Sequence, residues 1–348
     1  MASWAKLAFK MNRKGIVFTF IVVVLLSVIL IAFLINIRTQ NVQSKIQENN
    51  IKIETLNSFN KALKEQIIPQ AIKSSSNRAV LALLQHLDEV NIGAKSTSGV
   101  FINSDLNGVL KNAMIKEEYG LFHLNDMVET TNEAKTNYTL PSIFEEIKTL
   151  AENTGIDFSY SALDNVDVEI IQLDAWTLSV TVEGIDYKVS DFKGETFWDL
   201  NDQIFSATLD VTNYRDPFML VFDDRNLTIN KTEITNWNLT NFKLFYLRPE
   251  FRQHDDTPEF LSRLKGEFNP SIKGIETVLD LNYYNASKDY SNIDFHYWKK
   301  SGPLACEVDG ISIPSPSGET RYLYLDNQHL SYYNRLNGGD QDCNTPFP

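Results

Sequence analysis

An uninterrupted apolar segment near the N-terminus constrains this chain more than any other feature. It runs from Gly15 to Ile37 (GIVFTFIVVVLLSVILIAFLINI) and contains no charged residue. Four cations precede it, Lys6, Lys10, Arg13 and Lys14, and no acidic residue occurs before it. About 20 consecutive apolar residues in a helix are long enough to cross the hydrocarbon core of a bilayer. The pattern therefore predicts a transmembrane helix, with the lipid bilayer as a partner.

The charges that flank this segment predict its orientation. Positive residues gather on the cytoplasmic side of membrane spans, so we expect residues 1–14 in the cytoplasm and the bulk of the chain outside the cell. A cleaved secretory signal peptide is the alternative, but its apolar core is shorter, roughly 7–15 residues, and a small-residue cleavage site follows it. No Ala-x-Ala site occurs between Asn36 and Gln40. The sequence favours a retained anchor and a single-pass protein of the cell membrane.

The overall charge excludes one class of partner. The formal net charge is −13, which disfavours binding to nucleic acid because the phosphate backbone is itself negative. Hydrophobic residues make up 43% of the chain, enough for a folded core outside the membrane. The sequence therefore predicts a folded acidic ectodomain with no nucleic-acid partner.

Two cysteines, Cys306 and Cys343, stand near the C-terminus. In an oxidising exterior we expect a structural disulfide between them, worth roughly 3–4 kcal/mol in the chain-entropy model. A metal site or a redox pair is the alternative, but the chain has neither a CxxC motif nor a cluster of Cys and His.

Glycosylation is expected on the same side of the membrane. Five Asn-x-Ser/Thr sequons follow the apolar segment, at Asn137, Asn226, Asn230, Asn238 and Asn285. Three of them lie close together in a turn-rich stretch, which favours modification there. The sequence thus predicts a glycoprotein.

Hydrophobic periodicity predicts an α+β fold. A heptad-like pattern extends the apolar segment into an amphipathic helix as far as Ile68, where Pro69 should kink or end it. This helix either forms a coiled coil with a partner or packs on later helices of the same chain. Further helices are expected at 70–87, 106–118 and 141–153, the last followed by Gly155.

The period changes from helical to alternating after Val166, which predicts a mainly antiparallel β region. Phe242–Leu247 and Ile293–Trp298 are among its expected strands, and Thr257–Lys265 is its one expected helix. The expected organisation is a cytoplasmic basic tail (1–14), a transmembrane helix (15–37), a helical stalk (38–155), a β-rich extracellular domain (156–335) and a C-terminal tail (336–348).

The N-terminus resembles a known family. Arg13-Lys14-Gly15-Ile16-Val17, followed by the apolar segment, is similar to the class III signal peptide of archaeal type IV pilins. The resemblance implies cleavage between Gly15 and Ile16 by a prepilin peptidase, and a long helix that packs in a filament below a β-rich head. Phe20 departs from the family, which often has Glu there. Residues 192–218 and 263–277 also look similar to uncharacterised pilin-like surface proteins of archaea.

No residue pattern predicts a reaction. His254-Asp255-Asp256 is a candidate metal or acid–base group, but no second His lies at a ligand spacing, so a solvated loop is the preferred interpretation. Asp223-Asp224-Arg225 and Asp340-x-Asp342 lack the ligand pattern of an EF-hand. No GxSxG, HExxH or P-loop motif occurs. The sequence predicts no enzyme, no metal and no cofactor.

Two functions from different classes remain open. The leading hypothesis is a membrane-anchored surface protein, a pilin-like filament, adhesion or assembly component whose partners are copies of itself or other pilin-like subunits. The alternative is an extracytoplasmic sensor or receptor that needs a partner to signal. A cell-envelope enzyme is the least favoured interpretation.

Overall fold

The chain divides into two compact units in a computed structural model. The model describes residues 22–29, 45–91, 100–102, 105–116, 118–119, 122–123, 128–130, 135–194, 197–223, 227–284, 289–300, 304–314 and 320–333. Unit 1 comprises Met1–Ala82, Asn107–Ile170 and Val180–Thr208, and unit 2 comprises Leu83–Leu106, Ile171–Ser179 and Leu209–Pro348. The domain limits expected from the sequence stay a prediction.

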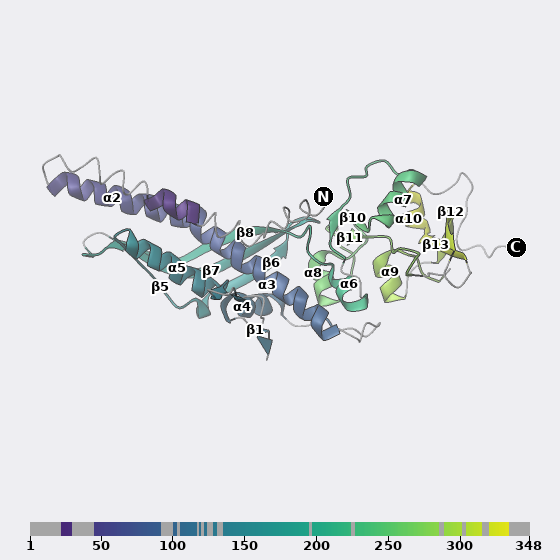
Figure 1. The fold of residues 1–348 in the computed structure, drawn as a ribbon, viewed down its shortest axis with the longest axis horizontal. Coiled ribbons are helices and arrows are strands. Elements are labelled where there is room, and N and C mark those ends of the chain that lie inside the picture. Colours follow the sequence, from purple (N-terminus) through teal and green to yellow (C-terminus); the bar gives the residue numbers. More distant parts are fainter. Residues whose placement is uncertain are drawn as a thin grey trace, which may run out of the picture. The chain divides into compact units, whose positions relative to one another are not determined.

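A long helical segment dominates unit 1. It consists of α2 (Lys45–Ala62), a π-helical turn η1 (Leu63–Ile67) and the start of α3 (Ile68–Asn91), and Figure 1 shows these elements following one another. The expected helix end at Pro69 is wrong, because α3 continues through it. Proline lacks an N–H and its ring opposes the carbonyl four residues earlier. The wider π turn lies immediately before Pro69, where such a conflict would fall.

The other helices of unit 1 follow the sequence more closely. They are α4 (Leu106–Lys116), close to the expected helix, and α5 (Leu140–Asn153). The Ser142 N–H donates to Oγ1 of Thr139, the N-cap of α5, at 3.4 Å, and Gly155 follows the helix with φ of 85°. Two short hairpins join these helices, β1 (Glu118–Tyr119) with β2 (Phe122–His123), and β3 (Val128–Thr130) with β4 (Lys135–Asn137).

A four-stranded sheet completes unit 1. Its strands are β5 (Ile156–Tyr160), β6 (Asp167–Gln172), β7 (Thr177–Asp191) and β8 (Phe197–Asp210), with the short turn η3 (Leu163–Asn165) between the first two. The order is β5-β7-β6, and β8 also pairs with β7. Along β7 the buried positions change from even to odd numbers at Gly184, whose φ is 84°. A left-handed glycine inside a strand is typical of a bulge, which shifts the register by one residue.

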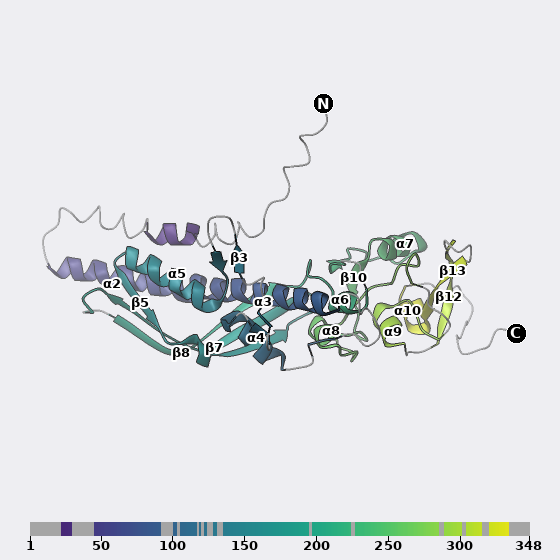
Figure 2. The same cartoon turned by 60° about the horizontal axis from the view of Figure 1, so that its bottom comes forward.

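Aromatic side chains hold the helices of unit 1 against this sheet. Phe158 of β5 lies 6.5 Å from Phe59 of α2, 6.2 Å from Phe144 of α5 and 6.0 Å from Tyr187 of β7, measured between ring centroids. All four side chains are at most 2% exposed. Figure 2 shows α2 and α5 lying along one side of the strands. One apolar layer between helices and sheet therefore forms this core.

Short elements make up unit 2. They are α6 (Pro217–Phe222), β9 (Asn230–Lys231), α7 (Leu239–Leu247), β10 (Glu250–Gln253), α8 (Phe260–Lys265), β11 (Ile275–Glu276), α9 (Asp294–Lys299), β12 (Ala305–Pro314), β13 (Thr320–Asp326) and α10 (Asn327–Tyr332). The strands form a three-stranded sheet, β11-β10-β9, and a hairpin, β12-β13. An apolar cluster that includes Phe218, Phe242, Leu323 and Tyr333 packs between these elements.

The described residues form an α+β fold with mainly antiparallel pairing, so this part of the expected fold class holds, whereas its N-terminal transmembrane helix does not. Two expected strands are nevertheless wrong, because Phe242–Leu247 lies in α7 and Ile293–Trp298 lies largely in α9. In α7 the buried side chains of Phe242 and Phe245 are three residues apart, which is helical spacing. The helix begins at Asn238, whose Oδ1 accepts a hydrogen bond from the Asn241 N–H at 2.9 Å.

The expected transmembrane helix is corrected by the structure. Of the predicted segment 15–37, only residues 22–29 are described, and they are helical. Among the helices that the structure describes, none combines the length and apolar composition that a bilayer crossing requires. The predicted N-terminal membrane span, and the location in the cell membrane that depended on it, are therefore withdrawn.

Candidate metal centre

Three segments of unit 2 bring two histidines and a glutamate together. β10 and β11 pair antiparallel with Arg252 opposite Glu276, and His254 directly follows β10. Residues two apart on a strand share a face, so this register directs His254 toward the glutamate as well. The third segment is α10, which carries His329 and begins after Asp326. The sheet register and one helix start therefore position the group.

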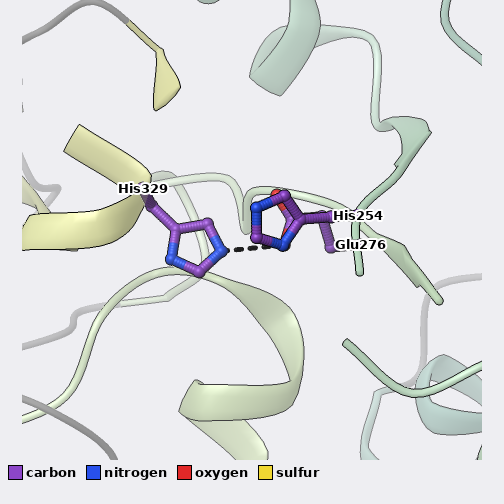
Figure 3. A group of neighbouring side chains, drawn as sticks. All are labelled: His254, Glu276 and His329. Atoms are coloured by element: carbon purple, nitrogen blue, oxygen red, sulfur yellow. Dashed lines mark hydrogen bonds and ion pairs between the residues drawn. The ribbon is translucent and has the colours of Figure 1, made fainter. Parts of the chain in front are cut away.

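The three side chains face one another at short range. Oε2 of Glu276 lies 2.9 Å from Nε2 of His329 and 3.6 Å from Nδ1 of His254. These three atoms all lie within 4.8 Å of one another. His254 is 8% exposed, Glu276 0% and His329 1%, so the group is shielded from solvent. Figure 3 shows His329 approaching from one side and His254 with Glu276 from the other.

Further side chains fix the orientation of this group. Oδ2 of Asp326 lies 2.6 Å from Nδ1 of His329. The other oxygen of Glu276, Oε1, accepts hydrogen bonds from Nε of Arg252 at 2.7 Å and from the Tyr333 hydroxyl at 3.1 Å. Since Oε1 is held on that side, Oε2 is left facing the two imidazoles. A carboxylate on the far nitrogen of a histidine is the usual support of a metal ligand.

The charges of the group follow from burial and pairing. Burial by itself lowers the pKa of His329, but Glu276 and Asp326 outweigh it and raise the pKa to about 10. Burial would raise the pKa of Glu276, yet His329 and Arg252 hold it well below its usual range. The pKa of His254 is lowered by burial, more than Glu276 raises it. His254 is therefore a neutral imidazole at neutral pH, the form that binds metal.

The donor set fits a divalent transition metal. Zinc binds histidine nitrogen and carboxylate oxygen at roughly 2.0–2.2 Å, so neighbouring donors of a tetrahedral site lie about 3.4 Å apart. The observed separations of 2.9 and 3.6 Å lie on either side of that value. Two imidazoles and one carboxylate suit zinc and similar ions better than calcium or magnesium. Nδ1 of His254 is buried and makes no hydrogen bond within the described residues.

A second buried charge cluster of unit 2 has no such donor set. Nη1 of Arg263 lies 3.0 Å from Asp216 Oδ1, and Nη2 lies 2.7 Å from Asp294 Oδ2. All three side chains are 0% exposed. Burial raises the pKa of Asp294 to about 7, although Arg263 opposes the shift, and burial likewise raises the pKa of Asp216. This cluster joins α6, α8 and α9 and is structural.

The structure places some of the residues that the sequence analysis singled out. Asn230 lies on β9 and Asn238 caps α7, and both are exposed; Asn137 lies on β4. Asn226 and Asn285 lie outside the described residues. Which sequons carry a glycan stays a prediction.

The remaining predicted sites lie partly beyond the described chain. Cys306 is on β12 opposite Leu325, but Cys343 is not among the described residues, so the disulfide stays a prediction. Gly15 and Ile16, the expected processing site, also lie outside the described residues.

Sequence reasoning recognised only one member of the candidate centre. Asp255 and Asp256 are exposed, as a solvated loop requires, but His254 is buried. Its partners are remote in sequence: Glu276 and His329 are 53 positions apart. A histidine directly after a strand was the available signal, but nothing local to it identifies the partners.

Comparison with known proteins gives no relative. No protein-family model, no curated protein and no solved structure matches this chain. The resemblance of the N-terminus to archaeal pilins, and the filament, adhesion or receptor role drawn from it, stay predictions.

Proposed function

We propose that this protein binds one divalent transition-metal ion, with zinc the first candidate, through Nδ1 of His254, Oε2 of Glu276 and Nε2 of His329. The observation that carries the proposal is the buried Nδ1 of His254. Within the described residues it makes no hydrogen bond, yet it faces the same carboxylate oxygen as His329. A buried polar atom without a partner costs roughly 1–3 kcal/mol, and a metal ion would satisfy it.

The burial of the ligands favours a structural role for the ion. Structural zinc sites are closed, whereas catalytic ones keep a position open to substrate. With exposures of 8%, 0% and 1%, the three ligands offer no broad access to a substrate. The ion would tie the end of β10, the strand β11 and the helix α10 into one unit. This agrees with the sequence-based prediction that the chain is not an enzyme, which stays a prediction.

Without metal, the same residues form an ion pair. His329 then keeps both ring protons and donates them to Glu276 and Asp326, which accounts for its raised pKa. Metal binding replaces the proton on Nε2, since a ligand nitrogen must be deprotonated. The two states differ by one proton and one ion, and both are compatible with the observed positions of Asp326 and Arg252.

The test is a zinc-binding titration of the purified full chain after chelator treatment, with His254→Ala as the decisive variant. Burial lowers the pKa of His254, and its Nδ1 makes no hydrogen bond in the part of the chain that the structure describes, so its removal leaves no buried charge unpaired. We expect zinc affinity to fall by more than the roughly 10–100-fold that losing a supporting partner costs. His86→Ala, a histidine of α3 outside the cluster, is the matched control and should bind as the parent does.

Cobalt gives an independent reading of the same site. Substituted Co²⁺ should show the visible absorption of a tetrahedral site with nitrogen and oxygen ligands, and His254→Ala should weaken it. Equal zinc affinity in the parent and the His254→Ala variant would reject the proposal, as would a parent that binds no zinc. The group would then be a buried ion pair only.

A further inference from the structure

His329 has a second set of donors on its other ring nitrogen. Nδ1 lies 2.6 Å from Oδ2 of Asp326, and the same oxygen lies 3.8 Å from Nε2 of His296. The donor atoms of His296, Asp326 and His329 all lie within 4.8 Å of one another. His296 comes from α9, so a fourth segment of unit 2 joins the centre.

The two sets match each other across the imidazole of His329. On the Nε2 side stand a carboxylate at 2.9 Å and a histidine 3.6 Å from that carboxylate. On the Nδ1 side stand a carboxylate at 2.6 Å and a histidine 3.8 Å from that carboxylate. Each side thus offers two imidazoles and one carboxylate, the donor set that suits zinc and copper.

We propose that His329 bridges two metal ions, one held with His254 and Glu276 and the other with His296 and Asp326. This inference rests on the proposed function of the same centre and adds a second ion to it. The two ions displace both ring protons of His329, which leave to solvent, and the ring becomes a bridging imidazolate.

The second position needs only a small rearrangement. Metal–ligand bonds of about 2.1 Å place neighbouring donors about 3.4 Å apart, so Asp326 must retreat from His329 by less than an ångström. His296 is 16% exposed, against 9% for His254, measured on the side chains. The second ion is therefore the nearer of the two to solvent.

The experiment counts zinc ions per chain by mass spectrometry after equilibrium dialysis of the full protein against Zn²⁺. We expect two ions in the parent, one in His296→Ala, one in His254→Ala and two in the control His86→Ala. Circular dichroism of each variant checks that it is folded. The paired variants remove one position each and leave the shared His329 in place.

Copper provides a second, spectroscopic test of the bridge. Two Cu²⁺ ions bridged by one imidazolate couple magnetically, so the second equivalent should weaken the electron paramagnetic resonance signal per copper. His296→Ala should restore the uncoupled signal of a single ion.

The outcomes separate the two proposals. One zinc ion in both the parent and His296→Ala, with loss in His254→Ala, overturns the bridge and leaves the proposed function standing. Two ions that persist in His296→Ala also overturn the bridge. No bound ion in the parent rejects the proposed function, and the bridge with it.

Discussion

The two units of this protein bury different kinds of polar group. Within the described part of unit 1, the buried polar residues carry only hydroxyl groups: Ser74, Ser75, Ser76, Thr139 and Ser190. Unit 2 buries eight acidic, basic or histidine side chains among its described residues: Asp216, Arg252, His254, Arg263, Glu276, Asp294, Asp326 and His329. Aromatic contacts occur in both cores, but among the described residues only unit 2 also buries charged side chains that face one another.

Element length accounts for this difference. Unit 1 contains most of β7 and β8, which have 15 and 14 residues, and long strands pair their backbone groups along the ladder. The three-stranded sheet of unit 2 has strands of two, four and two residues. In unit 2 a buried side chain also pairs with the backbone of a turn: Nε of Arg263 donates a hydrogen bond to the carbonyl of Pro258 at 3.4 Å. The polar residues that unit 2 buries include the donors of the proposed metal centre.

The largest effect is expected from removing the cation of the structural cluster. Arg263→Met leaves Asp216 and Asp294 buried without their partner, and breaking such a pair costs about 3–5 kcal/mol. Urea unfolding should show this loss. Arg215→Ala is the matched control, because its pair with Asp88 is partly exposed at 25% and 29%. That change should cost no more than about 1 kcal/mol, and an equal loss in the two variants would contradict the contrast.

Next in size is a dependence of unit 2 on pH in metal-free protein. The pKa of His329 is about 10 in the folded chain, above its ordinary 6.5. A group whose pKa is raised by folding stabilises the fold fully below its unfolded pKa, and this stability is lost as pH rises through the folded value. We expect the urea midpoint to fall between pH 7 and 10.

The variant His329→Gln isolates this titration. It is less stable than the parent at pH 7, but its stability should change less between pH 7 and 10 because the titrating group is gone. His86→Ala should keep the slope of the parent. A parent whose stability is flat over this range would show that His329 is not paired as described.

Zinc should stabilise unit 2 and leave the stability of unit 1 unchanged. A ligand at 100 times its dissociation constant stabilises the folded state by about 2.7 kcal/mol. Hydrogen exchange should therefore slow in peptides from β10, β11 and α10, and remain unchanged in peptides from β5 and β7. In His254→Ala the protection of β10 and β11 should be lost. Slowed exchange in β5 and β7 as well would argue against a local centre.

The smallest effect is expected from a helix cap in unit 1. Thr139→Ala removes the acceptor for the Ser142 N–H at the start of α5 and should cost about 1 kcal/mol. Asp216 caps α6 in the same way, through the Met219 N–H at 3.1 Å, but it also pairs with Arg263. Asp216→Ala should therefore cost several times more by urea unfolding. Equal costs would mean that the ion pair adds nothing to the cap.

Several helices and strands could be predicted because they depend on residues that are close together in the sequence. α5 follows from the proline in its first turn and from Gly155, and α4 from its apolar spacing. The alternation in β7 and β8 follows from one face being buried. The helices α7 and α9 were missed because six to nine residues of mixed apolar sequence fit a strand as well as a helix, and packing decides between them.

The membrane span was also predicted from a local pattern, and this prediction is wrong. Apolar composition from Gly15 to Ile37 predicted a spanning helix, and the helices of the described chain do not bear it out.

The sequence by itself determined the composition of the chain and the order of its elements. The chain is acidic, its helices precede its strands, and its five histidines form no ligand motif. Only the tertiary structure decided that His254, His296 and His329 lie around Glu276 and Asp326. The physical reason is that a ligand set drawn from a strand end, a second strand and two helices leaves no spacing rule in the chain. Its geometry is set by the register of Arg252 against Glu276 and by the start of α10 at Asp326, both of which arise when unit 2 packs.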